Sequence, residues 1–195
     1  NHVFDVGLEP AQIIHLSQKA EHNFVGMHCG IMDQFAAVYG KKGHFVKLDC
    51  RSLDSEYYPL YFEDYQLILC NSNVQHELAS SEYNVRRKQC KEGVNTIKQN
   101  YPSVKNLRDV TFDMLEEYQE QMDEEVLDRC LYVLQENERV HDTCEKLQQN
   151  DLDAIGNNLY LSHKGLSEMY EVSCDETDYL VELTKDMEHV KGARM

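Results

Sequence analysis

The spacing of apolar residues in the second half of the chain restricts the fold more than any other feature of the sequence. Apolar side chains recur at intervals of three or four between residues 127 and 169, at Leu127, Cys130, Leu131, Leu134, Cys144, Leu147, Leu152, Ile155, Leu159, Leu166 and Met169. This period places them on one face of a helix. It predicts two or three long amphipathic helices, and residues 81–100 predict another.

A further helix is predicted near the end of the chain. Ser173 and Glu176 fit the Ser-x-x-Glu capping box, in which each side chain bonds a backbone amide at the helix start. This helix is expected to run to residue 188, and a strand is expected from Val190 onward.

The first half has a different pattern. Residues 43–50 alternate with period two, residues 57–62 are rich in aromatics, and residues 65–70 form a continuous apolar run, so three strands are predicted. Before them, a helix beginning at Pro10 and ending near Asn23 and a second over residues 31–39 are predicted, joined by a glycine-containing loop. The predicted fold class is α+β, with one domain junction near residue 62.

The charge of the chain excludes several classes of function. There are 35 acidic and 19 basic residues, which gives a net charge of -16. Such a field repels nucleic-acid phosphates and anionic lipid, so neither is expected as a partner. The acid is concentrated between Thr111 and Asp153, where we expect solvated helix faces.

The seven cysteines are isolated from one another, and no Cys-x-x-Cys pair occurs. We expect them to be buried as small hydrophobic residues in a protein of a reducing compartment. With no signal peptide or long apolar run in the sequence, a cytoplasmic location is expected. The chain starts at Asn1 and stops after Lys191-Gly-Ala-Arg-Met195, and we expect it to be a piece of a longer protein.

The first candidate site is the loop Gly26–Gly30 and the helix start that follows it. Asp33 falls in the first turn of the predicted helix, where free N–H groups and the positive end of the helix dipole favour a carboxylate. That position suits a general base or a charge beside a phosphoryl group. On spacing alone, a plain helix-start aspartate is the commoner use.

Other candidates are weaker on spacing alone. Glu21 is a possible Mg²⁺ ligand or a solvent-facing glutamate, and Tyr83 is a possible sugar contact or a packing residue. His28 beside Cys29 suggests a nucleophile and base only faintly, because neighbouring side chains in a loop point apart. No Gly-Lys-Ser/Thr phosphate loop occurs, so an ATP loop, if the protein uses one, lies outside this sequence.

Four blocks in order resemble galactokinases of the GHMP kinase superfamily. They are Ala20–Phe35 (AEHNFVGMHCGIMDQF), Gly43–Leu53, Cys70–Cys90 and Tyr170–Asp178, and the closing Gly192–Met195 resembles the start of the family's third motif. The resemblance implies the GHMP fold, with residues 1–62 completing the N-terminal domain and residues 63–195 forming most of the ferredoxin-like C-terminal domain.

The resemblance also implies an activity. Asp33 matches the catalytic aspartate, Gly30 and Tyr83 match contacts to the sugar, and Glu21 matches the Mg²⁺ ligand. The implied reaction moves the γ-phosphoryl group of ATP to the C1 hydroxyl of galactose, in a monomer or weak dimer, and the chain alone is expected to be inactive. Two alternatives are a non-catalytic galactose sensor and a structural module whose acidic helices bind a partner.

Overall fold

The computed structural model describes residues 6–62, 64–74 and 79–195, with the side chains of residues 79–83 left out. The chain divides into two compact units, Asn1–Asp64 and Tyr65–Met195, and each is treated separately below. Within the described residues, no helix has the length and apolar character needed to cross a membrane.

The first unit opens with a helix that changes its pitch. α1 (Pro10–Ala20) begins with proline in its first turn, and the Gln12 side chain accepts a hydrogen bond from the Glu9 amide at 2.9 Å. α1 continues directly into the π turn η1 (Glu21–Val25). Gly26 then ends the helical run with φ 76°, a left-handed conformation that glycine adopts without steric cost. The predicted helix ending near Asn23 is confirmed.

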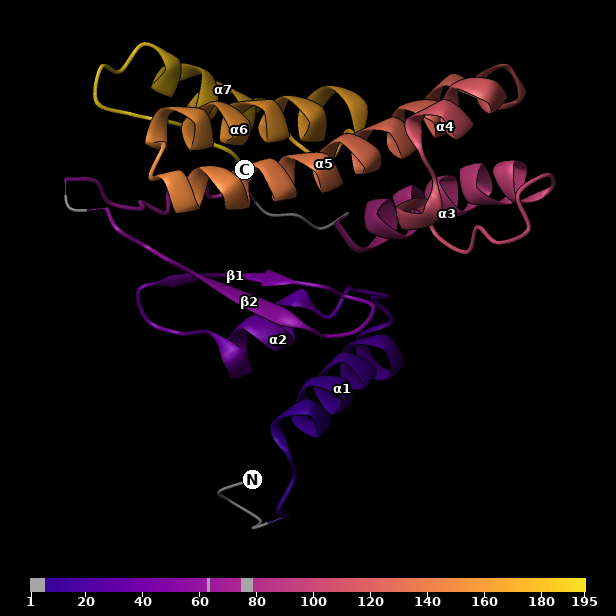
Figure 1. Cartoon of the computed structure of the whole chain (residues 1–195), viewed down its shortest axis with the longest axis horizontal. Helices are drawn as coiled ribbons and strands as arrows, with labels where there is room; N and C mark the ends of the chain where they lie inside the picture. The colour runs from indigo at the N-terminus through magenta and orange to yellow at the C-terminus, as the bar shows by residue number, and fades with distance from the viewer. Residues whose placement is uncertain (1–5, 63, 75–78) are drawn as a thin grey trace. The chain divides into compact units, whose positions relative to one another are not determined.

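A second helix and a hairpin complete this unit. α2 (Met32–Tyr39) precedes β1 (His44–Leu48) and β2 (Ser55–Pro59), which pair antiparallel with His44 opposite Pro59. The two strands predicted here are confirmed, although β2 begins before residue 57 and ends before residue 62, the predicted bounds. Figure 1 shows the hairpin beside α2, and a small core joins them: Ile14, Ile31 and Phe35, with Val46, Leu48 and Leu53 against them.

The third predicted strand, over residues 65–70, is wrong in this structure. Leu67, Ile68 and Leu69 are exposed, and the segment joins no sheet within the described residues. A strand needs a neighbour to satisfy its backbone groups, and no described segment supplies one. The apolar run has the composition of a strand, but no described segment pairs with it.

The described residues of the second unit form helices, and the long helices predicted for it are confirmed. Its elements are α3 (Ala79–Lys98), η2 (Leu107–Asp109), α4 (Phe112–Tyr118), η3 (Gln119–Gln121), α5 (Glu124–Gln149), α6 (Leu152–Lys164), η4 (Gly165–Met169) and α7 (Asp175–Lys185). Figure 1 shows α6 running back along α5. Ten buried side chains, including Ile97, Val104 and Cys130, form the core where α3, α4 and α5 meet. The acidic residues between Thr111 and Asp153 are exposed or half-buried, as predicted.

The start of α7 is one residue away from the predicted capping box. Cys174, not Ser173, is the N-cap, and its amide donates to the Thr177 hydroxyl at 3.2 Å. The Ser173 hydroxyl instead donates to the Asp178 carboxylate. The helix also ends at Lys185, before the predicted residue 188.

Two arginines hold the turn between η4 and α7. Arg129, on α5, is 1% exposed and donates to the Met169 carbonyl and, at 2.5 Å, to the Glu171 carboxylate. Arg86, on α3, donates to the carbonyls of Tyr170 at 2.6 Å and Glu171 at 3.0 Å. Glu171 has φ 49°, which is unusual for a residue with a side chain. The turn is therefore fixed from two helices.

The final segment lies against α6 without forming the predicted strand, since it joins no sheet in the part of the chain described. Gly156 and Gly192 approach so closely that a Cβ on Gly156 would lie 1.8 Å from the Lys191 carbonyl oxygen. The Lys191 ammonium pairs with Asp153 at 2.6 Å, and the Met195 amide donates to His163 Nδ1 at 3.3 Å.

All seven cysteines are free thiols. Cys130 and Cys144 are buried as predicted, but Cys50 and Cys70 are exposed. The predicted burial is therefore confirmed for Cys130 and Cys144 and wrong for Cys50 and Cys70.

Candidate functional site

Asp33 is the second residue of α2 and lies in its first turn, as the sequence predicts. Its carboxylate is exposed, and within the described chain it forms no hydrogen bond or ion pair. No side chain caps the start of α2. The amides of that turn and the helix dipole thus leave a positive region beside a carboxylate that is available to a ligand.

Gly30 lies two residues before α2 and is exposed. Its φ is outside the left-handed region, and a Cβ placed on it would meet no atom within 4 Å. Neither backbone conformation nor packing within the described residues therefore requires glycine here. A residue without a side chain leaves the backbone here open to close approach by a ligand.

Glu21 is the first residue of η1 and is half-buried. Its carboxylate has no hydrogen-bond or ion-pair partner among the described residues. In that part of the chain, no three histidine, cysteine, aspartate or glutamate side chains cluster as metal ligands. One free carboxylate fits Mg²⁺, which commonly takes one or two protein carboxylates and completes its shell with phosphate oxygens and water.

The loop between η1 and α2 is held at Cys29. The Cys29 carbonyl accepts hydrogen bonds from His22 Nε2 at 2.9 Å and from Gln18 Nε2 at 3.2 Å. The Cys29 thiol accepts a third from Gln34 Nε2 at 3.7 Å. Sequence reasoning missed Gln18 and His22. Their spacing of four residues, which puts both on one helix face before a glycine-rich loop, was the available signal.

Tyr83 falls in α3, in the second unit. Its side chain lies outside the described residues, so its predicted sugar contact stays a prediction. Glu21, Gly30 and Asp33 are in the first unit, where they occupy the stretch of chain from η1 to the first turn of α2.

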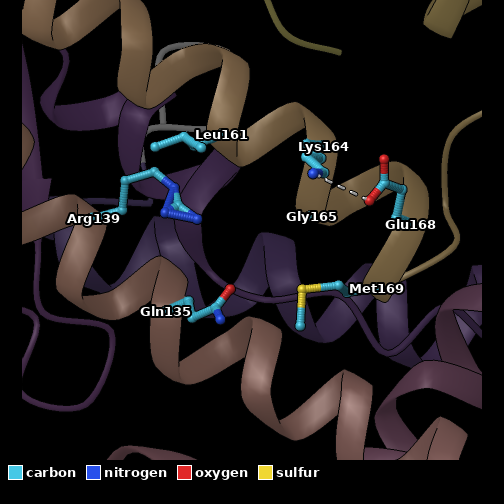
Figure 2. A pocket seen from close by; sticks show the side chains of 7 residues that line it. All are labelled: Gln135, Arg139, Leu161, Lys164, Gly165, Glu168 and Met169. Carbon is cyan, nitrogen blue, oxygen red and sulfur yellow. Dashed lines mark ion pairs between the residues drawn. The ribbon is translucent and has the colours of Figure 1, made fainter.

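Two hollows, one on each unit, are lined by residues other than the predicted ones. Figure 2 shows one of about 210 Å³ in the second unit, where Arg139 and Gln135 of α5 face Lys164 and Glu168. Lys164 and Glu168 pair at 3.7 Å across its rim. Another, of about 500 Å³, lies in the first unit beside Ile14, Phe35 and Leu53. Neither is lined by Glu21, Gly30 or Asp33.

Comparison with known proteins gives one consistent result. The profile of the GHMP kinases N terminal domain matches residues 1–41. Galactokinase of Thermotoga maritima is 42% identical over 192 residues, which is 98% of this chain and 52% of that protein. Human galactokinase is 41% identical over 178 residues, which is 91% of this chain and 44% of that protein. The chain thus spans about half the length of these relatives.

The fold agrees with the sequence. Lactococcus lactis galactokinase, crystallised with galactose, superposes with a TM-score of 0.92 and 28% identity over 99% of this chain and 50% of its own. The predicted α+β GHMP fold is confirmed. Along almost its whole length, this chain is similar to the galactokinases, and its first 41 residues match the N-terminal domain of the GHMP kinases.

Proposed function

We propose that this chain forms part of an ATP-dependent galactokinase, which transfers the γ-phosphoryl group of ATP to the C1 hydroxyl of galactose. The observation that carries the proposal is 42% identity to a galactokinase over 98% of the chain. The solved relative of the same fold contains galactose, which supports this sugar as the ligand.

Asp33 is the proposed catalytic residue. Phosphoryl transfer depends mainly on positioning and on neutralising charge, with little covalent help from the protein. The exposed carboxylate at the start of α2 would orient the sugar hydroxyl and accept its proton as the new P–O bond forms. The Gly30 backbone and the Tyr83 hydroxyl are the proposed further contacts to the sugar.

Glu21 is the proposed Mg²⁺ ligand. Bound there, the ion would neutralise charge on the ATP phosphates during transfer. Glu21 and Asp33 lie at the two ends of one connection, from the end of α1 to the start of α2. This supports a division of labour in which one carboxylate serves the nucleotide and the other serves the sugar.

The remaining predictions belong to the same proposal. Residues 1–62 would complete an N-terminal domain and residues 63–195 would form most of a C-terminal domain, and two compact units, 1–64 and 65–195, support that division. Seven free thiols support a reducing, cytoplasmic location. A monomer or weak dimer is proposed.

The test is galactose-dependent ADP formation by a polypeptide of galactokinase length that contains this sequence. Asp33→Asn should lower kcat by about a thousandfold, since a positioned general base contributes on that order. Asp54→Asn is a matched control, because Asp54 is also exposed in the first unit. Near wild-type turnover by Asp33→Asn would reject Asp33 as the base.

Two further outcomes separate the alternatives. Galactose binding without ADP formation by the same long polypeptide would favour the sensor. The 195-residue chain alone, whose sequence has no glycine-rich phosphate loop, should release no ADP with galactose.

A further inference from the structure

The Cys29–Gly30 peptide has an unusual arrangement of partners. Its carbonyl oxygen accepts two side-chain hydrogen bonds, from His22 and Gln18. Its N–H, which belongs to Gly30, donates no hydrogen bond to any described residue. One side of the peptide is therefore saturated while the other is unused.

The planarity of the peptide links its two sides. Every described peptide bond is trans, and in a trans peptide the C=O and the N–H point in opposite directions. Holding the carbonyl oxygen toward α1 and η1 therefore turns the Gly30 amide away from them. Gly30 is exposed and a Cβ built on it would meet no atom within 4 Å, so no described side chain packs over the residue that carries this amide.

The hydrogen bonds from Gln18 and His22 to the Cys29 carbonyl form a clamp, and this clamp is supported from both sides of the loop. Gln18 belongs to α1 and His22 to the π turn, while Gln34 of α2 holds the Cys29 thiol and the Cys29 amide donates to the Met27 carbonyl at 2.9 Å. π turns are rare and occur frequently at functional sites. Here one π turn carries both the clamp residue His22 and the proposed Mg²⁺ ligand Glu21.

We infer that His22 and Gln18 are positioning residues for the sugar: they fix the Cys29–Gly30 peptide so that the Gly30 amide donates to a hydroxyl of galactose beside Asp33. The inference rests on the proposed function and extends it to two residues that do not touch the substrate. His22 must donate through Nε2, because a carbonyl oxygen only accepts.

The kinetic test uses the long, active polypeptide and removes one donor at a time. His22→Phe and Gln18→Met keep much of the side-chain volume and abolish donation. Each should raise the KM for galactose about three- to tenfold, as expected for one lost hydrogen bond, and leave the KM for ATP unchanged. His22→Gln keeps a donor at similar reach and should stay within about twofold of wild type.

The matched control is His15→Phe, which replaces an exposed histidine on α1 and should change neither KM. Equal rises in both KM values, or a His22→Gln variant as impaired as His22→Phe, would overturn the inference by showing a merely structural role. Unchanged galactose KM in the double variant His22→Phe/Gln18→Met would overturn it as well.

A spectroscopic measurement on the 195-residue chain separates this inference from the proposed function. The double variant His22→Phe/Gln18→Met should shift the ¹³C resonance of the Cys29 carbonyl and the amide resonance of Gly30. The amide resonance of Gly43 should stay unchanged. Absence of the shift would reject the clamp even if the long polypeptide phosphorylates galactose. A shift together with a long polypeptide that does not bind galactose would reject the proposed function, and with it the role of the clamp.

Discussion

The two units of this chain differ in how completely they bury their own side chains. The second unit has ten buried residues in one cluster, supported by seven more that are partly buried. Among its described residues, the first has three, with three more against them, and its sheet has two strands. Small two-stranded sheets are marginal on their own. The unit that carries Asp33 is thus the one with the smaller core.

This difference follows from the kinds of element involved. The helices of the second unit satisfy their backbone groups internally and pack along continuous apolar faces. In the first unit, α2 has eight residues and the loop between η1 and α2 depends on side chains such as His22. Glu21, Gly30 and Asp33 lie in the unit with the smaller core, and binding segments commonly belong to the less stable parts of a fold.

Truncating one fully buried isoleucine in each unit should have the largest effect and tests the difference in core size directly. Ile14→Ala and Ile97→Ala each remove a side chain that is 0% exposed, a change that costs about 2–5 kcal/mol. The first should abolish amide protection throughout α1 and α2, because few other buried groups remain there. The second should weaken its unit without unfolding it.

Hydrogen exchange followed by mass spectrometry reports each unit separately. Leu16→Ala, at an exposed position of α1, is the control for Ile14→Ala. If the amides of α1 and α2 stay protected in Ile14→Ala, the first unit does not depend on its small core as the comparison of the two units holds.

Removing Arg129 tests the polar side of the second unit. Arg129→Leu removes the donor to the Met169 carbonyl and the nearer of two arginines on the Glu171 carboxylate, at 2.5 Å, while Arg86 stays at 3.5 Å. We expect a loss of about 2–4 kcal/mol in unfolding free energy. Arg194→Leu, at an arginine with a half-exposed side chain, should change it by less than about 0.5 kcal/mol. Similar urea midpoints for the two variants would contradict this expectation.

Substituting Gly156 tests the docking of the final segment on α6. A Cβ there would overlap the Lys191 carbonyl, so Gly156→Ala should release residues 191–195 and cost about 1–3 kcal/mol despite a better helix propensity. Asn157→Ala, exposed on the same helix, is the control. Faster amide exchange at Met195 in the first variant only is the expected result, and unchanged exchange would reject the overlap.

The smallest expected effect is a pH dependence in the second unit. Burial lowers the pKa of His163, and nearby Lys185 and Arg194 lower it further, against the Asp178 carboxylate, which raises it. The unfolded chain then binds more protons than the folded one. The contribution of His163 to the unfolding free energy should therefore be fully present above about pH 6.5 and be lost as pH falls through the lowered pKa of the folded state.

Denaturant titrations between pH 7 and pH 5 measure this dependence. His163→Gln should flatten it, whereas His141→Gln, at an exposed position of α5, should not. An unchanged slope in His163→Gln would assign the dependence to other groups.

Sequence reasoning succeeded where the determining interactions are local. Helix periodicity predicted the helices of the second unit, and the position of Asp33 followed from one loop and one helix start. The run over residues 65–70 misled because strand pairing depends on distant residues. Ser173 misled because its hydroxyl had a competing acceptor in Asp178, a tertiary contact. Gln18 and His22 were missed because their common target is a backbone carbonyl, so that only their spacing of four residues pointed to them.

The turn at Glu171 has a consequence for how the second unit assembles. A left-handed residue with a side chain costs roughly 1–2 kcal/mol locally, and here the compensating donors arrive from α3 and α5, more than 40 residues upstream for Arg129 and more than 80 for Arg86. A short peptide covering the turn would lack these donors and is not expected to adopt the conformation seen at Glu171. A probe attached at this corner would therefore report when α3 and α5 have come together, and the entry to α7 cannot take its final direction before they do.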